Sequence, residues 1–169
     1  EAMDTYAPLA TRLGIARFKS ELEDLSFRYL EPDAYADLVA KVKKSEPERE
    51  KYIREVCKVM SQKLAKQGFA ADVTGRAKHL YSIWRKMQSQ QCDFDKVYDV
   101  VAFRCLVESV ADCYAVLGVV HSQWTPVPGR FKDYVALPKP NMYQSLHTTV
   151  LGPGHERVEV QIRTHEMHR

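Results

Sequence analysis

The chain lacks the sequence features that mark several large classes of protein. No stretch approaches the ~20 consecutive apolar residues of a membrane-spanning helix, and no signal-peptide pattern is present. The four cysteines form no C-x-x-C pair and no zinc spacing. Cys105 and Cys113 stand among apolar residues, as buried reduced thiols do. We therefore expect a cytoplasmic protein that does not bind a membrane.

A strong excess of charge of one sign is also missing. The 25 basic and 22 acidic residues leave a net charge of +3, which is too small to indicate a general nucleic-acid-binding surface. Direct binding of nucleic acid is not expected, and any binding of anions must come from local clusters. Internal repeats and low-complexity tracts are absent as well. Because the chain starts at Glu1 and stops at Arg169 in what resembles the opening of a helix, we expect it to be part of a longer protein.

The spacing of apolar residues predicts an all-helical N-terminal segment, residues 1–67. Glu31-Pro32 separates a first helix from a second, and Ser45-Glu46-Pro47 is expected to begin a third, which ends at Gly68. In the first helix the spaced apolar positions are Ile15, Phe18, Leu22, Leu25 and Tyr29.

From residue 68 onward, short β-rich runs alternate with helical ones. Hairpin-length links join the last three runs, which predicts antiparallel pairing there, while the earlier helical connections permit parallel neighbours. The sequence therefore predicts an α+β domain, 68–169, with a mixed five-stranded sheet flanked by helices. Strands are expected at 69–75, 98–107, 131–137, 145–151 and 157–163, and helices at 77–90 and 110–122.

The segment TGRAKHLYSIWRKM carries the first cluster of phosphate-seeking groups. If a helix begins just after Gly75, then Lys78, Ser82 and Lys86 form one polar stripe at i, i+4 and i+8. The two lysines would lie about 12 Å apart with a hydroxyl between them, which suits a triphosphate. Arg76 at the helix entrance could stack on a base or bind a phosphate. The alternative is a solvated basic face on an ordinary amphipathic helix.

Two of the expected strands carry carboxylates. Asp99 interrupts the apolar run VYDVVAFRCLV, where a carboxylate is costly unless a cation or a metal pairs with it. Alternation in RVEVQIRT places Glu159, Gln161 and Arg163 on one face of a strand. Carboxylates on neighbouring strands can hold a divalent metal. The alternatives are an ion pair between Asp99 and Arg104 or a lysine, and a solvated strand face for Glu159.

The loop GRFKDYVALPKPNMYQSLHTT gathers cations around an aromatic ring. Its tyrosine offers a flat face for stacking a base, its two prolines stiffen the loop, and its amides and histidine can bind polar base edges or phosphates. A prolyl hairpin turn, with the tyrosine packed on the core, is the alternative. The three clusters together predict a site for two phosphorylated ligands with a metal between them. The loop residues concerned are Arg130, Lys132, Lys139, Asn141, Tyr143, Gln144 and His147.

These segments, in this order, closely resemble the synthetase domain of the RelA/SpoT homologue family, the long enzymes of the bacterial stringent response. The resemblance covers residues 70–168, and residues 6–32 look like the helical tail of the hydrolase domain that precedes the synthetase. No His-Asp dipeptide occurs in the chain, so the metal-dependent hydrolase site of the family is missing from it. The segments are TGRAKHLYSIWRKM, YDVVAFRCLV, DCYAVLGVVHSQW, PGRFKDYVALPKPNMYQSLHTTVLGP and VEVQIRTHEMH.

The resemblance implies a nucleotidyltransferase-type fold and a defined reaction. Such synthetases transfer pyrophosphate from ATP to the 3′-hydroxyl of GDP or GTP, which gives ppGpp or pppGpp and AMP. Arg76 and Arg104 would bracket the adenine, and Lys78, Ser82 and Lys86 would hold the ATP phosphates. In the long family members, association with the ribosome would involve domains outside this chain.

The resemblance also implies roles for the acidic and aromatic residues. Asp99 would bind Mg²⁺ or Mn²⁺ together with Glu159, and Glu159 would take the proton from the 3′-hydroxyl. Tyr143 would stack on guanine. The remaining contacts to the guanine nucleotide would come from Lys139, Asn141, His147, Gln161 and Arg163.

A tetrad of residues separates branches of the family. Arg130-Phe131-Lys132-Asp133 looks like the basic form found in bifunctional enzymes, which implies that the parent protein also hydrolyses ppGpp and favours manganese. Two other functions stay open. One is a catalytically weak guanine-nucleotide-binding regulatory module, and the other is an RNA-binding nucleotidyltransferase-like domain.

Overall fold

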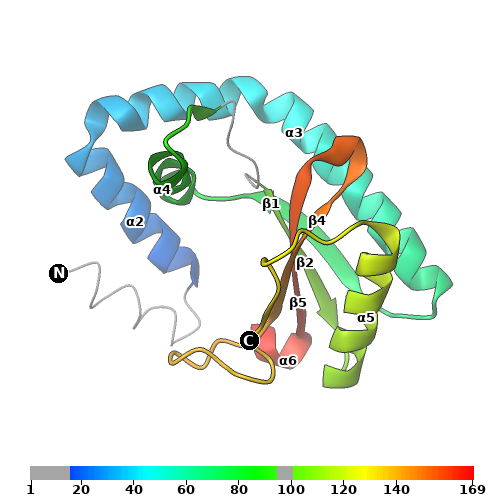
Figure 1. The fold of residues 1–169 in the computed structure, drawn as a ribbon. Helices are drawn as coiled ribbons and strands as arrows, with labels where there is room; N and C mark the ends of the chain where they lie inside the picture. The colour runs from blue at the N-terminus through cyan, green and yellow to red at the C-terminus, as the bar shows by residue number, and fades with distance from the viewer. Residues whose placement is uncertain (1–15, 95–100) are drawn as a thin grey trace.

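The computed structural model describes residues 16–94 and 101–169 as a five-stranded sheet with helices packed around it (Figure 1). The strands are β1 (Asp72–Ala77), β2 (Val101–Val107), β3 (Lys132–Asp133), β4 (Leu146–Leu151) and β5 (Arg157–Thr164). The helices are α2 (Ala16–Leu30), α3 (Pro32–Lys66), α4 (Leu80–Gln90), α5 (Val110–Gln123), the 3-10 helix η2 (Pro153–His155) and α6 (His165–His168).

The sheet is mixed, and the order of its strands is β1-β2-β5-β4-β3. β1 pairs antiparallel with β2, β2 pairs parallel with β5, and β4 pairs antiparallel with both β5 and β3. The chain between the parallel strands β2 and β5 contains α5, β3 and β4, and a short link joins the antiparallel pair β4 and β5. The antiparallel strands β1 and β2 are connected through α4. The expected α+β class with a mixed five-stranded sheet is confirmed.

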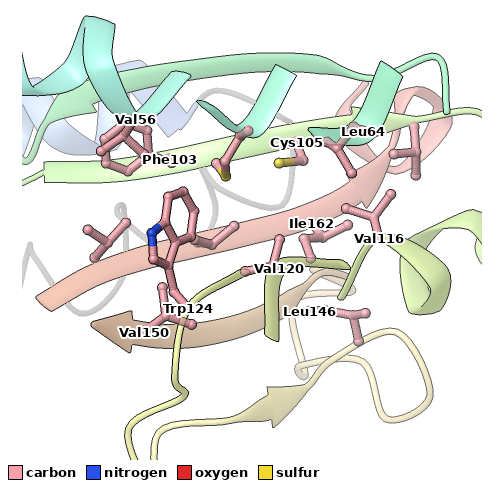
Figure 2. Close-up of a cluster of buried hydrophobic side chains, with 14 of the residues drawn as sticks. Val56, Leu64, Phe103, Cys105, Val116, Val120, Trp124, Leu146, Val150 and Ile162 are labelled. Carbon is pink, nitrogen blue, oxygen red and sulfur yellow. The ribbon is translucent and has the colours of Figure 1, made fainter. Parts of the chain in front are cut away.

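One face of the sheet is buried under α5 and the C-terminal half of α3, while α2 and α4 lie on the other side (Figure 1). The alternation expected for β5 is confirmed, because Val158, Val160 and Ile162 are all fully buried in this core. Figure 2 shows how the two helices and the strands contribute to it. The labelled core residues are Val56, Leu64, Phe103, Cys105, Val116, Val120, Trp124, Leu146, Val150 and Ile162.

A second, smaller core joins α2 to α4 and to the start of α3. Phe27, Leu38 and Ile83 are buried in it, and the Phe27 ring stacks on Trp84 with the ring centroids 4.9 Å apart. The spacing in α2 identified the helix but not the face that it buries. Leu25 and Tyr29 are 61% and 85% exposed, because α2 turns the side that carries Phe27 toward α4.

The helix break expected at Ser45-Glu46-Pro47 is wrong, since α3 continues through Pro47. Proline has no N–H and leaves one helical hydrogen bond unmade. Polar side chains fill this turn. The Ser45 hydroxyl and the Arg49 guanidinium donate to the carbonyl of Val42 at 3.0 and 3.1 Å, and Arg49 also donates to Ser45 Oγ at 3.0 Å. Among the described residues, no helix, α3 included, is both long enough and apolar enough to span a membrane.

β1 lies later in the chain than the expected 69–75, and Gly75 falls inside it rather than at its end. A Cβ on Gly75 would lie 2.7 Å from the ring of Phe103, its partner in the register. Glycine is therefore needed for close packing and not for a turn. As a consequence Arg76 belongs to the strand, and Lys78 lies in the connection before α4, which starts at Leu80.

The expected strand over 131–137 shortens to β3, Lys132–Asp133. The Asp133 carboxylate is the cause. Its Oδ1 accepts hydrogen bonds from the backbone N–H groups of Val135 and Ala136 at 3.0 and 2.9 Å. An aspartate that binds the backbone two and three residues ahead folds the chain into a turn and ends the ladder.

Candidate functional site

The strand register aligns polar side chains across the face of the sheet opposite the main core. Arg104 on β2 lies between Thr74 on β1 and Gln161 on β5. Gln161 in turn lies opposite His147 on β4, and His147 opposite Lys132 on β3. Side chains of paired residues point to the same face, so this row crosses the whole sheet. The neighbouring row contains Arg76, Ala102, Glu159 and Thr149.

Glu159 and Lys78 form an ion pair at the centre of this face. The Lys78 Nζ lies 2.6 Å from Glu159 Oε2, with the side chains only 19% and 22% exposed, and Gln161 donates to Glu159 Oε1 at 3.3 Å. Burial raises the pKa of the Glu159 carboxyl, but the Lys78 ammonium and the hydrogen bonds outweigh burial. The pKa consequently lies below its ordinary value. Glu159 is thus a partly buried carboxylate whose charge depends on one lysine.

Tyr143 lies among cations and rings. Arg163 Cζ and Lys139 Nζ lie 4.8 and 5.2 Å from the centroid of the Tyr143 ring, and the Tyr143 hydroxyl contacts His147 Nε2 at 2.8 Å. The Tyr134 ring packs edge-on against His147 with the centroids 5.3 Å apart, and Lys139 Nζ also lies 4.7 Å from the Tyr134 centroid. The loop therefore presents aromatic faces already placed beside positive charge.

His147 is a neutral imidazole at neutral pH. Burial lowers its pKa to about 4, and the cations Lys139, Arg163 and Lys78 add to the decrease, while Glu159 opposes it. A neutral ring offers one N–H donor and one acceptor. It can therefore accept a hydrogen bond from, or donate one to, a polar ligand without adding charge to the face.

The cations and the carboxylate of the basic tetrad, Arg130-Phe131-Lys132-Asp133, have different surroundings. Arg130 and Lys132 line a cavity of about 460 Å³ together with His147 and Glu159. Asp133 does not join them, because its Oδ2 accepts a hydrogen bond from the Tyr114 hydroxyl of α5 at 2.8 Å. The cavity thus combines two cations with a carboxylate, a combination suited to a phosphorylated ligand that has a reacting hydroxyl.

Arg76 and Arg104 line a second cavity, of about 140 Å³, beside Gln161. Burial lowers the pKa of Arg104, and the nearby Arg76 lowers it further. Among the described residues the buried Nε of Arg104 has no hydrogen-bond partner. Two planar guanidinium groups on adjacent strands can stack on a flat base or bind phosphate oxygens.

The basic stripe expected on α4 is only partly present. Ser82 and Lys86 lie one turn apart on α4, but Lys78 precedes the helix and points to Glu159 instead. The cause is the position of β1, which continues to Ala77 and leaves no room for a helix at Lys78. Ser82 Oγ contacts the ring of His79, a residue to which the sequence pattern assigned no role.

The other predicted site residues fall into two groups, and one residue that was not predicted joins the site. Asp99 lies outside the described residues. Asn141 and Gln144 shape the loop, because Asn141 Oδ1 accepts a hydrogen bond from Tyr143 N at 3.1 Å and the Gln144 amide donates to Val135 O at 3.3 Å. Tyr134 joins the cluster although the pattern gave no sign of it, since its ring is brought there only by the turn after β3.

Comparison with known proteins identifies related sequences over the whole chain. The region found in RelA and SpoT proteins matches residues 75–169. A GTP pyrophosphokinase of Myxococcus xanthus is 57% identical over 169 residues, which is 100% of this chain and 22% of that protein. A probable guanosine-3′,5′-bis(diphosphate) 3′-pyrophosphohydrolase of Synechocystis is 52% identical over 99% of this chain and 22% of its own length. The chain spans about a fifth of the length of these relatives.

A solved structure shares the fold. The small alarmone synthetase 1 from Bacillus subtilis, crystallised with its product pppGpp, superposes with a TM-score of 0.57 at 24% sequence identity. The match covers 74% of this chain and 72% of that one. At this identity the similarity establishes the architecture and leaves the roles of individual side chains to the geometry of the face described above.

Proposed function

This chain belongs to the RelA/SpoT family, and we propose that it is the part of the protein that transfers pyrophosphate from ATP to the 3′-hydroxyl of GDP or GTP. The products are ppGpp or pppGpp, and AMP. Its identity to proteins named GTP pyrophosphokinase supports this reaction. The proposal includes a transfer domain, 68–169, preceded by a helical segment, 1–67, whose helix α3 also supplies Val56 and Leu64 to the main core.

The cavity between Arg76 and Arg104 is proposed as the site of the adenine. Its volume of about 140 Å³ and its two guanidinium groups suit a flat base held between them. Lys78, Ser82 and Lys86 follow this cavity along the chain and would bind the ATP phosphates. Because Lys78 precedes α4, its ammonium lies 2.6 Å from Glu159, the proposed base.

The cavity beside Glu159 is proposed as the site of the guanine nucleotide. Tyr143 would stack on guanine, while the larger cavity beside Arg130 and Lys132 accommodates its phosphates. The remaining polar contacts would come from Lys139, Asn141, His147, Gln161 and Arg163. Because Lys139 and Arg163 already lie near the faces of Tyr143, guanine would exchange places with at least one of them.

Glu159 is proposed as the base. The 3′-oxygen attacks the β-phosphorus of ATP, its proton passes to Glu159, and the bond from the β-phosphorus to the oxygen of the leaving AMP breaks. The ion pair with Lys78 would couple the proton transfer to the binding of ATP. If the Lys78 ammonium binds an ATP phosphate instead of Glu159, burial still raises the pKa of Glu159. The ammonium, which is the main cause that lowers this pKa, is then no longer beside it. Loss of the Lys78 contact, taken by itself, would therefore make Glu159 a stronger base.

Glu159 and Asp99 are the proposed protein ligands of a Mg²⁺ or Mn²⁺ ion. Among the described residues no group of three or more His, Cys, Asp or Glu side chains could hold a metal ion. Glu159 nevertheless supplies a carboxylate oxygen, the donor that both ions prefer, and substrate phosphates can supply others. When bound, the ion would neutralise charge on the phosphates. The basic tetrad Arg130-Phe131-Lys132-Asp133 adds two points to the proposal. The ion would preferably be Mn²⁺, and the parent protein would also contain a hydrolase.

The ion-paired Glu159 beside the 460 Å³ cavity is the observation that carries this function. The test incubates the 169-residue chain with γ-labelled ATP and GDP, with Mg²⁺ and Mn²⁺ in parallel. We expect labelled ppGpp and equimolar AMP from the wild type, and almost none from Glu159→Gln, which should still bind both nucleotides. Glu156→Gln, at an exposed glutamate nearby, is the matched control and should react normally.

Each outcome of the assay has a clear meaning. Normal turnover by Glu159→Gln would show that Glu159 is not the base. Binding of both nucleotides by the wild type without release of AMP would identify the chain as a guanine-nucleotide-binding module instead.

A further inference from the structure

Helix α2 makes polar contacts with the first turn of α4, the helix that carries Ser82 and Lys86. α2 precedes the region 75–169 that matches the family. Two consecutive acidic residues of α2 make these contacts. Asp24 Oδ1 accepts a hydrogen bond from the backbone N–H of Tyr81 at 2.9 Å, and Glu23 Oε2 lies 3.4 Å from His79 Nε2.

The contact from Asp24 replaces a cap that α4 does not supply for itself. His79 is the N-cap residue of α4, and its side chain makes no capping hydrogen bond. A helix start normally has a local Ser, Thr, Asp or Asn that binds the second or third N–H group. Asp24 binds the second one, that of Tyr81, from a different helix. The start of α4 therefore depends on α2 for its position.

The contact from Glu23 continues to Ser82. Glu23 is 8% exposed, and its carboxylate faces the imidazole of His79. Ser82 Oγ lies 3.0 Å from His79 Nδ1 and 3.1 Å from Nε2. The three side chains therefore form a series of contacts, from the buried carboxylate to the ring and from the ring to the hydroxyl.

The burial of Glu23 calls for an explanation. Removal of a carboxylate from water is unfavourable unless a partner compensates, and a well-packed apolar residue would serve the core between α2 and α4 at least as well. Phe27, one turn away on the same face of α2, shows that this interface accepts apolar side chains. A buried glutamate whose partner is a histidine next to the donor site therefore indicates a role in that site.

We propose that Glu23 is a positioning residue that acts through His79 on Ser82 and so sets the affinity of the chain for ATP. The inference rests on the proposed function, in which Ser82 binds the ATP phosphates. It follows that helix α2, which precedes the matched region 75–169, helps to form the ATP site. Movement of α2 would change the affinity for ATP and leave the guanine-nucleotide site unchanged, because Tyr143 and Glu159 lie on other elements.

The test measures affinities rather than turnover. Calorimetry gives the Kd of α,β-methylene ATP, whose bridge cannot be cleaved, and the Kd of GDP, for the 169-residue chain and its variants. Loss of one hydrogen bond of ordinary strength lowers affinity by roughly 3- to 10-fold. We expect Glu23→Gln and Ser82→Ala each to weaken the ATP analogue by that factor and to change the Kd of GDP less than about 2-fold.

A double-mutant cycle separates positioning from general stability. If Glu23 acts through Ser82, then Glu23→Gln has little further effect in the Ser82→Ala background. Multiplied effects of the two substitutions would overturn the proposal, as would an equal loss of affinity for GDP. His79→Gln provides a second route to the same result if Glu23→Gln folds poorly, and thermal unfolding of each variant shows whether it does. Glu48→Gln, at an exposed glutamate of α3, is the matched control.

The outcomes distinguish this inference from the proposed function. A wild type that binds both nucleotides but forms no ppGpp contradicts the transfer reaction, while the cycle still decides the role of Glu23. A wild type that does not bind the ATP analogue overturns both.

Discussion

Acidification is expected to destabilise the chain through His147. Burial lowers the pKa of His147 from 6.5 to about 4. The unfolded chain therefore takes up this proton at a higher pH than the folded chain does. Stability from this group is fully present above pH 6.5, is lost as the pH falls toward 4, and changes no further below that. A difference of about 2.5 units at 1.36 kcal/mol per unit corresponds to roughly 3 kcal/mol.

Urea unfolding between about pH 7 and pH 4 measures this effect, with His147→Gln as the reference. The variant keeps the carboxylates that also titrate in this range, so the difference between the two free energies of unfolding isolates His147. We expect the advantage of the wild type over the variant to shrink by roughly 3 kcal/mol across the window. A difference that stays constant within about 0.5 kcal/mol would refute the argument that burial controls this ring.

Three further predictions concern single residues. Tyr143→Ala should weaken GDP binding in calorimetry and spare the ATP analogue, and equal weakening of both would remove Tyr143 from the guanine site. Gly75→Ala should lower the free energy of unfolding by about 1–3 kcal/mol, since its Cβ would lie 2.7 Å from the Phe103 ring, whereas Gly118→Ala, which meets nothing within 4 Å, should be neutral or stabilising. Lys78→Met should weaken the ATP analogue about 10-fold or more and change GDP affinity little, and an unchanged ATP affinity would contradict its role at the phosphates.

The sequence predicted the centre of the sheet well because burial alternates strictly in β2 and β5. In β5 the apolar and polar residues alternate from Arg157 to Arg163, so both the strand and its two faces follow from the pattern. The pattern predicted the wrong element boundaries where they depend on individual contacts. Gly75 marks close packing against Phe103 and not a strand end, and α3 continues through Pro47, where Ser45 and Arg49 donate hydrogen bonds to the carbonyl of Val42.

The site residues likewise include some that the sequence pattern predicts and others that depend on contacts between distant parts of the chain. The polar face of β5 could be foreseen from alternation, and the register then brings Gln161 between Arg104 and His147. Local spacing could not foresee Tyr134, which depends on a turn, or Glu23, which is 56 residues away from His79. Spacing also placed Lys78 on a helix, and only the length of β1 corrects this.

In the proposed reaction, both nucleotides would replace contacts that the protein makes within this face. Glu159 depends on Lys78 to keep its pKa low, so a donor that takes Lys78 changes the base before the acceptor reacts. Tyr143 has Arg163 and Lys139 beside its ring, so a guanine stacked there as proposed would displace a cation, which could then bind a phosphate. In both cases the substrate replaces a protein contact by a similar one, which limits the cost of desolvating the charged groups.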